Sequence, residues 1–371
     1  MPTSKASVNI FALSAQPQVD YQTVLAPGTA PKVHRQLEKT DRQLAKYSAP
    51  ASDNRGYSTG TPYPTRKTLD SHDVTVQLTE DLSSQLLGER ALAGFGEVAT
   101  VEKTVGQTYE HTFTMLNPQA SAQPPAYDYV EKQGEDAARP NAHNVEFPSM
   151  VCESFSVSGQ GRALLQASSS WRGSGKRISP SPLDFFGGGS EVILLEDMVH
   201  NFFRNTAAKL KLYPQINLGG TVHEVNCDFR DFEFSIAWNL LAEAGYLGCG
   251  LFQVAGDSES GAIRGKCEIG DPTASFNFTI IDNDAYNAYD KLQTMASISA
   301  SLKYEGSVIE GANKHFADFR LLHANIADID HTEVDGENAL RMTTEPLALG
   351  QVMPVELVVQ NDVSSYATPN W

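Results

Sequence analysis

The chain has 371 residues and a mass of 40.3 kDa, which at about 100–200 residues per domain predicts two or three packing units or one large β-domain with extensions. Apolar residues make up 41% of the chain and charged residues 20%, so wholesale disorder is excluded. The net charge of −17 argues against binding to a phosphate backbone or an anionic membrane surface, because both need clustered cations. The apolar runs are too short for a transmembrane helix, and the N-terminal residues have no secretory signal pattern.

The first segment, residues 1–72, is predicted to be a strand followed by an extended arm. Val8, Ile10 and Ala12 alternate as on one face of a strand. Residues 26–72 contain five prolines and few large apolar residues, although 32–47 has spacing compatible with a short helix. Residues 1–70 carry nine Lys and Arg against five Asp and Glu. We expect such a basic arm, which has no core of its own, to be ordered by lying on a neighbouring subunit or ring.

Helical patterns occur at three places. The predicted helices span residues 80–95, 191–213 and 282–296. Thr79 is expected to cap the first, which Gly94 and Gly96 end. The second is the most strongly helical segment of the chain, with Ser190 as its cap and Pro214 as its stop.

Most of the remaining sequence alternates as β-strands. Residues 145–173 predict two strands joined by a turn at 160–162, with a bulge in the first and serines along a wet side of the second. Residues 117–144 are rich in Pro, Ala and Gln and predict a loop. Further strands are predicted at 74–78, 109–116, 226–238, 274–281, 297–309, 315–329, 339–349 and 353–362. The predicted fold class is therefore mainly β, an antiparallel β-sandwich with flanking α-helices and an extended N-terminal arm.

The two halves of the chain have similar element patterns. After the arm at 1–72, residues 73–215 form a first β-rich half with helices, and residues 216–371 form a second, acidic β-rich half. The acidity is concentrated at 224–290, where twelve Asp and Glu face only three Lys and Arg. The similarity lies in pattern and not in identity, so a duplicated β-domain and a single domain both remain open.

No residue pattern indicates catalysis. The four cysteines, Cys152, Cys227, Cys249 and Cys267, are too few for a disulfide framework and form no CxxC pair. His223 lies four residues before Cys227, but in an alternating segment this spacing separates the two side chains by about 13 Å, so no metal site is predicted. A nucleophile elbow, a Walker sequence and an isolated carboxylate pair are all lacking. We therefore expect no enzyme activity and no cofactor.

Acidic residues crowd a predicted hairpin near the C-terminus. They are Asp328, Asp330, Glu333, Asp335 and Glu337, with Asp335-Gly336 at the tip of the turn. A solvated loop is one interpretation of this composition. The other is the acidic lining of a pore, which would repel phosphates.

The order of these segments resembles that of the tail tube proteins, or major tail proteins, of long-tailed bacteriophages. The resemblance extends over residues 75–365 and rests on pattern, since no catalytic motif is involved. It is carried by EDLSSQLLGERAL, YEHTFTM, VEFPSMVCESFSVSGQGRALLQASSSWRGSGK, FRDFEFSIAWNL, ASFNFTIIDNDAYNAYDKLQTM, SISASLKYEGSVI and ALRMTTEPLALGQVMPVELVVQND. The proline-bearing segment 26–72 departs from that pattern.

The resemblance implies a virion protein, made in the host bacterial cytoplasm, whose β-sandwich closes into rings. The ring would be a hexamer or a trimer of duplicated domains, and inner strands would join across subunits into a barrel. Stacked rings would form a tail tube that conducts DNA during ejection without binding it specifically. The implied partners are other copies of the chain and the terminator, tape measure and baseplate proteins, with no membrane partner.

Two further interpretations stay open. Another virion β-protein, such as a tail terminator, a baseplate component or a decoration protein, would share the strand content but form single rings or caps. A carbohydrate-binding or hydrolytic β-sandwich would need an aromatic cleft, whereas Trp171, Trp238 and Trp371 are scattered along the sequence. Filament formation separates the virion proteins from the sugar-binding protein.

Overall fold

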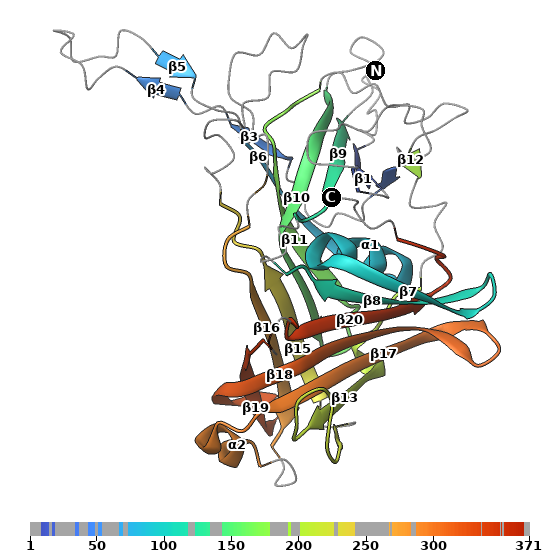
Figure 1. The fold of residues 1–371 in the computed structure, drawn as a ribbon, viewed down its shortest axis with the longest axis vertical. Coiled ribbons are helices and arrows are strands. Elements are labelled where there is room, and N and C mark those ends of the chain that lie inside the picture. Colours follow the sequence, from blue (N-terminus) through green and yellow to red (C-terminus); the bar gives the residue numbers. More distant parts are fainter. Residues whose placement is uncertain are drawn as a thin grey trace, which may run out of the picture.

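The computed structural model describes most of the chain from residue 73 onward and short parts of the arm. The described residues are 9–14, 17–18, 34–36, 44–48, 51–53, 67–69, 73–117, 123–133, 143–178, 192–193, 201–225, 229–241, 267, 269–282, 287–334, 336–348, 350 and 352–366. Antiparallel strands dominate this part, as predicted (Figure 1). No described helix is long and apolar enough to cross a membrane.

The first sheet contains strands from both halves of the sequence. In spatial order it consists of β6 (Asp73–Asp81), β11 (Gln166–Gly173), β10 (His143–Gln160), β15 (Phe229–Ala237), β16 (Thr273–Ile281), β19 (Glu337–Pro346) and the second half of β18 (Asn313–Val334). The predicted bulge lies in β10, between Cys152 and Ser154. Buried and solvent-facing residues alternate along β6, β11, β15 and the second half of β10, so this part of the sheet has one apolar side and one wet side.

The second sheet crosses the first. It consists of β14 (His223–Val225), β13 (Ala208–Tyr213), β17 (Ile298–Glu310), the first half of β18, β20 (Val355–Asn361), β8 (Thr108–Met115) and β7 (Gly96–Thr104). The long strand β18 pairs with β17 and β20 along its first half and with β19 along its second, so it belongs to both sheets. In Figure 1 the second sheet lies across the steeply running strands β10, β11 and β15. This is a β-sandwich, as the alternation predicted.

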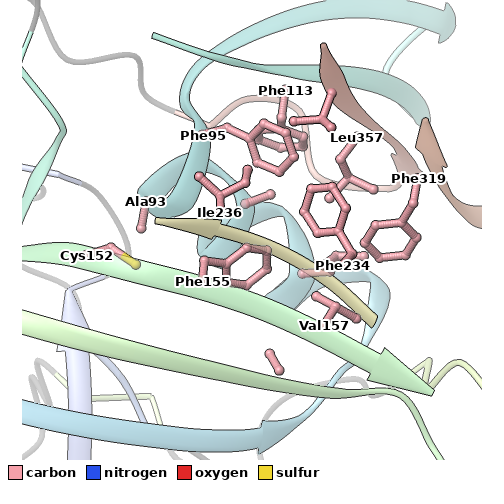
Figure 2. Close-up of a cluster of buried hydrophobic side chains, with 14 of the residues drawn as sticks. Ala93, Phe95, Phe113, Cys152, Phe155, Val157, Phe234, Ile236, Phe319 and Leu357 are labelled. Atoms are coloured by element: carbon pink, nitrogen blue, oxygen red, sulfur yellow. The ribbon is translucent and has the colours of Figure 1, made fainter. Parts of the chain in front are cut away.

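Aromatic rings from both sheets fill the space between them. Phe232 and Phe234 of β15 lie 5.4 Å and 5.5 Å, centroid to centroid, from Phe319 of β18. Phe95, at the end of the helix α1 (Ser84–Phe95), stacks on Phe234 at 5.7 Å (Figure 2). Burying these rings removes large apolar areas from water and fixes which side of each strand is wet.

Helix α1 is buried on all sides. Its cap is Ser83, whose hydroxyl accepts from the Leu86 N–H, so the prediction of Thr79 as the cap was wrong. Thr79 lies inside β6, which extends to Asp81 because its alternate residues face the core. Gly96 ends the helix at φ 92°, as predicted, because glycine has no Cβ and adopts this left-handed conformation without strain.

The helix predicted for 191–213 is wrong where the structure describes it. Residues 192–193 form β12 (Val192–Ile193), Asn205–Ala207 form a 3-10 turn, and β13 follows. Leu210 and Leu212 alternate into the core, so pairing with β17 on one side and β14 on the other overrides helix propensity. The third predicted helix is shorter than expected. In the described residues it is α2 (Ala288–Thr294), with Asn287 as its N-terminal cap.

The loop predicted for 117–144 contains a strand. β9 (Ala126–Gln133) pairs with the first half of β10 and with β1 (Asn9–Ser14), because Tyr127 and Tyr129 alternate into the core. Strand β1 confirms the predicted N-terminal strand and buries Phe11 and Leu13.

The described parts of the arm are short strands. The 32–47 segment contains β2 (His34–Gln36), next to β1, and part of β3 (Lys46–Ser48), next to β6, in place of the predicted helix. In each case pairing with a strand of the main sheet replaces helical hydrogen bonds. β4 (Ala51–Asp53) and β5 (Lys67–Leu69) pair only with each other, and Figure 1 shows this hairpin apart from the sandwich.

Candidate functional site: the polar face of the first sheet

The wet side of the first sheet, called the polar face here, is built by strand register. Because neighbours across an antiparallel pair point the same way, the pairings place one residue from each strand in a transverse row. One row is made of hydroxyl side chains from five strands, namely Thr79, Ser168, Ser156, Ser235 and Ser275. Short hydroxyl side chains on a pleated surface keep it hydrated and free of charge.

Hydrogen bonds tie these hydroxyls together across the strands. Ser154 and Ser170 lie 2.6 Å apart, Oγ to Oγ, and Ser235 and Ser275 lie 2.7 Å apart. Ser156 donates to the Ser168 carbonyl at 3.3 Å. The uncharged part of the face is therefore a fixed surface and not a set of free side chains.

The next rows of the polar face are acidic. The register sets Asp231 opposite Thr279, Thr279 opposite Arg341, and Arg341 opposite Asp330. Glu233 lies one row nearer the serines, opposite Asn277. A shallow hollow of about 350 Å³ lies over these rows, and its floor is polar. The face thus presents carboxylates and amides beside the hydroxyl rows.

Arginines on this face are neutralised by carboxylates. Within the described residues, Arg230 donates to Glu337 at 2.7 Å, Arg172 donates to Asp73 at 3.0 Å, and Arg341 lies 3.8 Å from Glu233. An arginine held by a carboxylate offers little to a phosphate, since its fork is already occupied. The arrangement leaves the face with a carboxylate excess.

The predicted acidic hairpin exists, and its residues divide between two sides. Strand β18 pairs with β19 up to Val334 opposite Glu337, and Gly336 in the turn has φ 81°. Asp328, Asp330 and Glu337 are exposed on the polar face. Glu333 pairs with Asn338 and points to the other side, because one residue along a strand reverses the direction of the side chain. Asp335 lies outside the described residues.

Sequence reasoning missed the acidic residues on β15. Asp231 and Glu233 were visible as the polar half of an alternating strand, but nothing in the sequence placed them on the same sheet face as Asp330, with two strands in between. Register between β15, β16 and β19 creates this proximity, which spans about a hundred residues of sequence. Only pairing partners, which alternation does not reveal, would have found them.

The thiols and histidines considered for chemistry stay apart. Cys152 and Cys267 are buried, and burial raises the pKa of the Cys152 thiol, which makes it unreactive. His223 lies on β14, whereas Cys227 and Cys249 fall outside the described residues. Within the described part of the chain, no three His, Cys, Asp or Glu side chains are arranged to hold a metal ion.

Comparison with known proteins shows a weak structural similarity. No family model and no curated protein matches this sequence. Among solved structures, the chain is similar to the SPP1 tail tube, determined by solid-state NMR and electron cryomicroscopy, with 12% sequence identity and a TM-score of 0.26. The match covers 44% of this chain and 80% of the tail tube chain. Similarity of this size does not establish a shared fold, so we base the proposed function on the polar face.

Proposed function

We propose that this chain is a structural protein of a bacteriophage virion, and specifically a tail tube protein whose rings stack into a conduit for DNA. The polar face is the observation that carries the proposal. It is a broad, rigid sheet surface on which hydroxyls and carboxylates dominate and the described arginines are ion-paired. These are the properties that the wall of a DNA conduit requires.

Electrostatics explains why such a wall would let DNA slide. A duplex binds where clustered cations displace its counterions, and a carboxylate excess produces the opposite field. Hydroxyl rows hold a water layer that gives phosphates no fixed partner. Repeated around a ring, Asp231, Asp328 and Asp330 would keep the duplex away from the wall.

The sandwich also has features suited to closing a ring. Strand β7 ends the second sheet as a nine-residue edge that pairs with β8 on one side. Such edges pair readily with strands of another chain. In this proposal, copies form a hexamer or a trimer of duplicated domains, and the terminator, tape measure and baseplate proteins bind its stacked ends.

Electron microscopy of the purified protein tests the proposal directly. Over a range of concentrations, negative stain is expected to show hollow tubes of stacked rings, whose symmetry can then be counted. Closed rings that never stack would indicate a terminator or baseplate component. Monomers at every concentration, even after addition of a nucleating tail tip, would contradict the tube role and direct the search to glycan binding.

Ejection kinetics test the role of the acidic residues. Replacing Asp328, Asp330 and Glu337 by Asn or Gln should permit assembly and slow DNA ejection, because the wall then repels phosphates less. Glu333→Gln is the matched control, since this exposed carboxylate points away from the polar face. Unchanged ejection in the triple variant, or equal slowing in the control, would remove the polar face from this role.

The arm hairpin provides a separate test of assembly. A two-stranded hairpin is marginally stable alone, so β4 and β5 are expected to rest on another copy. Replacing residues 51–69 by a Gly-Ser linker should leave folded monomers that fail to form tubes. This change keeps β1, which belongs to the core. Normal tubes from this variant would exclude the arm from the contact between subunits or rings.

A further inference from the structure

A short segment after β20 lies against the first turn of helix α1, and we call it the C-terminal latch (Asp362–Tyr366). The strand pairing of β20 ends at Asn361, so side chains hold the latch in place. Asp362 accepts from the Gln85 side-chain amide at 3.1 Å. Asn361, the last residue of β20, donates to the Ser84 carbonyl at 2.9 Å. The latch thus joins the end of the second sheet to the helix.

Tyr366 fills a slot between α1 and β8. It is 5% exposed, and its ring lies edge to face with the His111 ring, 4.6 Å away between centroids. The Tyr366 hydroxyl donates to the Gln85 carbonyl at 3.1 Å and accepts from the Asn361 amide at 2.8 Å. Gly88 makes room for the ring, because a Cβ at this position would lie 2.1 Å from it. The ring is therefore either seated in the slot or out of it.

His111 lies against Tyr366 and also holds the backbone of the latch. Its Nε2 lies 2.9 Å from the Val363 carbonyl, which can only accept, so Nε2 carries the proton of the neutral ring. Nδ1 then accepts from the Thr100 hydroxyl at 2.9 Å. Both nitrogens are occupied and the ring is buried, so a second proton would place a charge out of reach of water. Burial accordingly lowers the pKa of His111.

Few charges act on His111 from the elements packed around it. The titratable and charged side chains of those elements are Tyr109 and Glu110 of β8, Glu97, Glu102 and Lys103 of β7, Glu356 of β20, Glu89 and Arg90 of α1, and Asp362 and Tyr366 of the latch. Burial has the largest influence on the pKa of His111, whereas the hydrogen bond to Val363 and the charge of Glu110 raise it by less. Glu110 is itself ion-paired with Lys103 at 2.9 Å. A neutral His111 is therefore the state that fits the closed latch.

We propose that the C-terminal latch is an acid-sensitive strap, which opens when His111 takes up a proton while the sandwich stays folded. Tyr366 covers the His111 ring, so opening brings water to the ring and lets the imidazolium form. A group that binds a proton more readily in the open state shifts the equilibrium toward opening as pH falls. Acid would thereby release the C-terminal end of the chain from α1. The latch acts within a single chain, so it does not depend on the tube role.

A second buried histidine provides the matched control. His315 Nδ1 lies 2.9 Å from the Ser84 hydroxyl, and His315 Nε2 lies 3.2 Å from the Asn201 side-chain nitrogen. Burial lowers the pKa of His315 too, but its neighbour on the latch is Asp362, whose charge raises it. Opening removes this carboxylate, so a protonated His315 would hold the latch closed. His315 is thus buried like His111 but has the opposite expected effect on the latch.

Cleavage by chymotrypsin after Tyr366 measures the opening of the latch. The protease must take the tyrosine ring into its own pocket, which requires the ring to leave its slot. Cleavage releases the pentapeptide 367–371, which mass spectrometry counts. Dividing its rate at each pH by that of the free peptide 363–371 removes the pH dependence of the protease. From pH 7.5 to pH 5.5 the corrected wild-type rate should rise by up to about tenfold, the limit for one histidine whose open-state pKa is about 6.5. The near-UV circular dichroism of the buried Trp171 and Trp238 should not change.

Three variants separate the parts of the latch. His111→Gln keeps an amide donor for the Val363 carbonyl but cannot take up a proton, so its corrected rate should not change with pH. His315→Gln should keep the wild-type rise. Gly88→Ala places a Cβ in the slot and should raise the rate already at pH 7.5. This last change does not weaken α1, because alanine favours a helix more than glycine does.

Several results would overturn the latch. They are a wild-type rate that does not change with pH, an equal rise in His111→Gln, and a rise that His315→Gln abolishes. Wild-type protection of Tyr366 in Gly88→Ala would exclude the slot as the closing contact. Loss of the near-UV signal in step with cleavage would show unfolding of the whole sandwich in place of a local opening. The wild-type profile and Gly88→Ala decide the matter even if His111→Gln fails to fold.

Discussion

The two solvent-facing surfaces of the sandwich differ in chemistry although the same core supports both. The polar face carries short hydroxyl side chains and a carboxylate excess, and its hydroxyls bond to one another across strands. The outer side of the second sheet carries long Lys, Arg and Glu side chains in ion pairs, such as Arg320 with Asp318 at 2.6 Å and with Glu356 at 2.8 Å. Both alternate with buried residues, so periodicity alone does not distinguish them.

Side-chain length distinguishes the two surfaces. Serine and threonine hydroxyls lie close to the backbone and lose little freedom, so the polar face is smooth and fixed. Lysine and glutamate side chains extend away from the backbone, can exchange one ion-pair partner for another, and can form ion pairs with a second molecule. In the proposed tube, the polar face would exclude contact and the outer side would make it.

The largest expected effect comes from comparing the buried and the solvent-facing side of β6. Glu80 and Asp81 are neighbours on β6 that point to opposite sides. Glu80 is 2% exposed and accepts from Arg90 of α1 at 2.7 Å, so Glu80→Gln should lower the free energy of unfolding by about 3–5 kcal/mol, because a buried charge loses its partner. Asp81→Asn should change it by less than about 0.5 kcal/mol. Urea denaturation measures both, and equal losses would contradict the assigned sides of β6.

Acid should weaken the second sheet before the first. Burial lowers the pKa of His111 on β8 and of His315 on β18, so both are neutral in the folded state. Their contribution to the free energy of unfolding is complete above the ordinary histidine pKa of about 6.5. It falls as pH drops below that value, by at most about 1.4 kcal/mol per pH unit for each histidine.

The His111 network gives the matched variant for this acid effect. His111 contacts the Val363 carbonyl through Nε2 and the Thr100 hydroxyl through Nδ1, each at 2.9 Å. His111→Gln should flatten the fall in unfolding free energy between pH 7 and pH 5. An unchanged slope would show that His111 titrates in the folded state as it does in the unfolded chain.

Hydroxyl pairs on the polar face should contribute the same free energy of unfolding at every salt concentration. Ser235→Ala removes one partner of the 2.7 Å contact with Ser275 and should cost about 0.5–1.5 kcal/mol. Neither group is charged, so the loss should be the same at low and high ionic strength. A loss that shrinks in salt would mean that neighbouring carboxylates, and not the hydroxyl pair, dominate this part of the face.

The smallest expected effect lies on the outer side. The hydrogen bond from Lys209, together with the charges of Lys303 and Lys314, lowers the pKa of Glu305. The ionised Glu305 therefore contributes to the free energy of unfolding near neutral pH, and this contribution is lost as pH falls below the ordinary Glu value. Glu305→Gln should cost about 0.2–1 kcal/mol at low salt and less at high salt, since exposed ion pairs are screened. Denaturation at two ionic strengths checks this, and a salt-independent loss would contradict the ionic character of the surface.

Local patterns predicted those elements whose own residues decide their structure. Alternation of Phe232, Phe234 and Ile236 with polar neighbours predicted β15, and Asp335-Gly336 predicted the hairpin turn between β18 and β19. The β10 bulge was visible as a slip in the apolar pattern. In each case the signal lies within a few residues of the feature it specifies.

Prediction failed where pairing outweighed local preference. The 191–213 segment has helical spacing, yet β17 and β14 draw Leu210 and Leu212 into a sheet. The signal at 126–133 was hidden by a Pro- and Ala-rich composition, although Tyr127 and Tyr129 alternate into the core. A strand between two others gains ladder hydrogen bonds and burial that no short window of sequence contains.

The sequence by itself determined the mainly β class, the wet and dry sides of most strands, the acidic hairpin and the basic arm. Only the tertiary structure decided which wet sides share a surface. It placed Asp231 in one row with Arg341 and Asp330 and sent Glu333 to the other side. The reason is physical: a strand's alternation is fixed by its own side chains, whereas register and neighbours are fixed by the burial that distant segments achieve together.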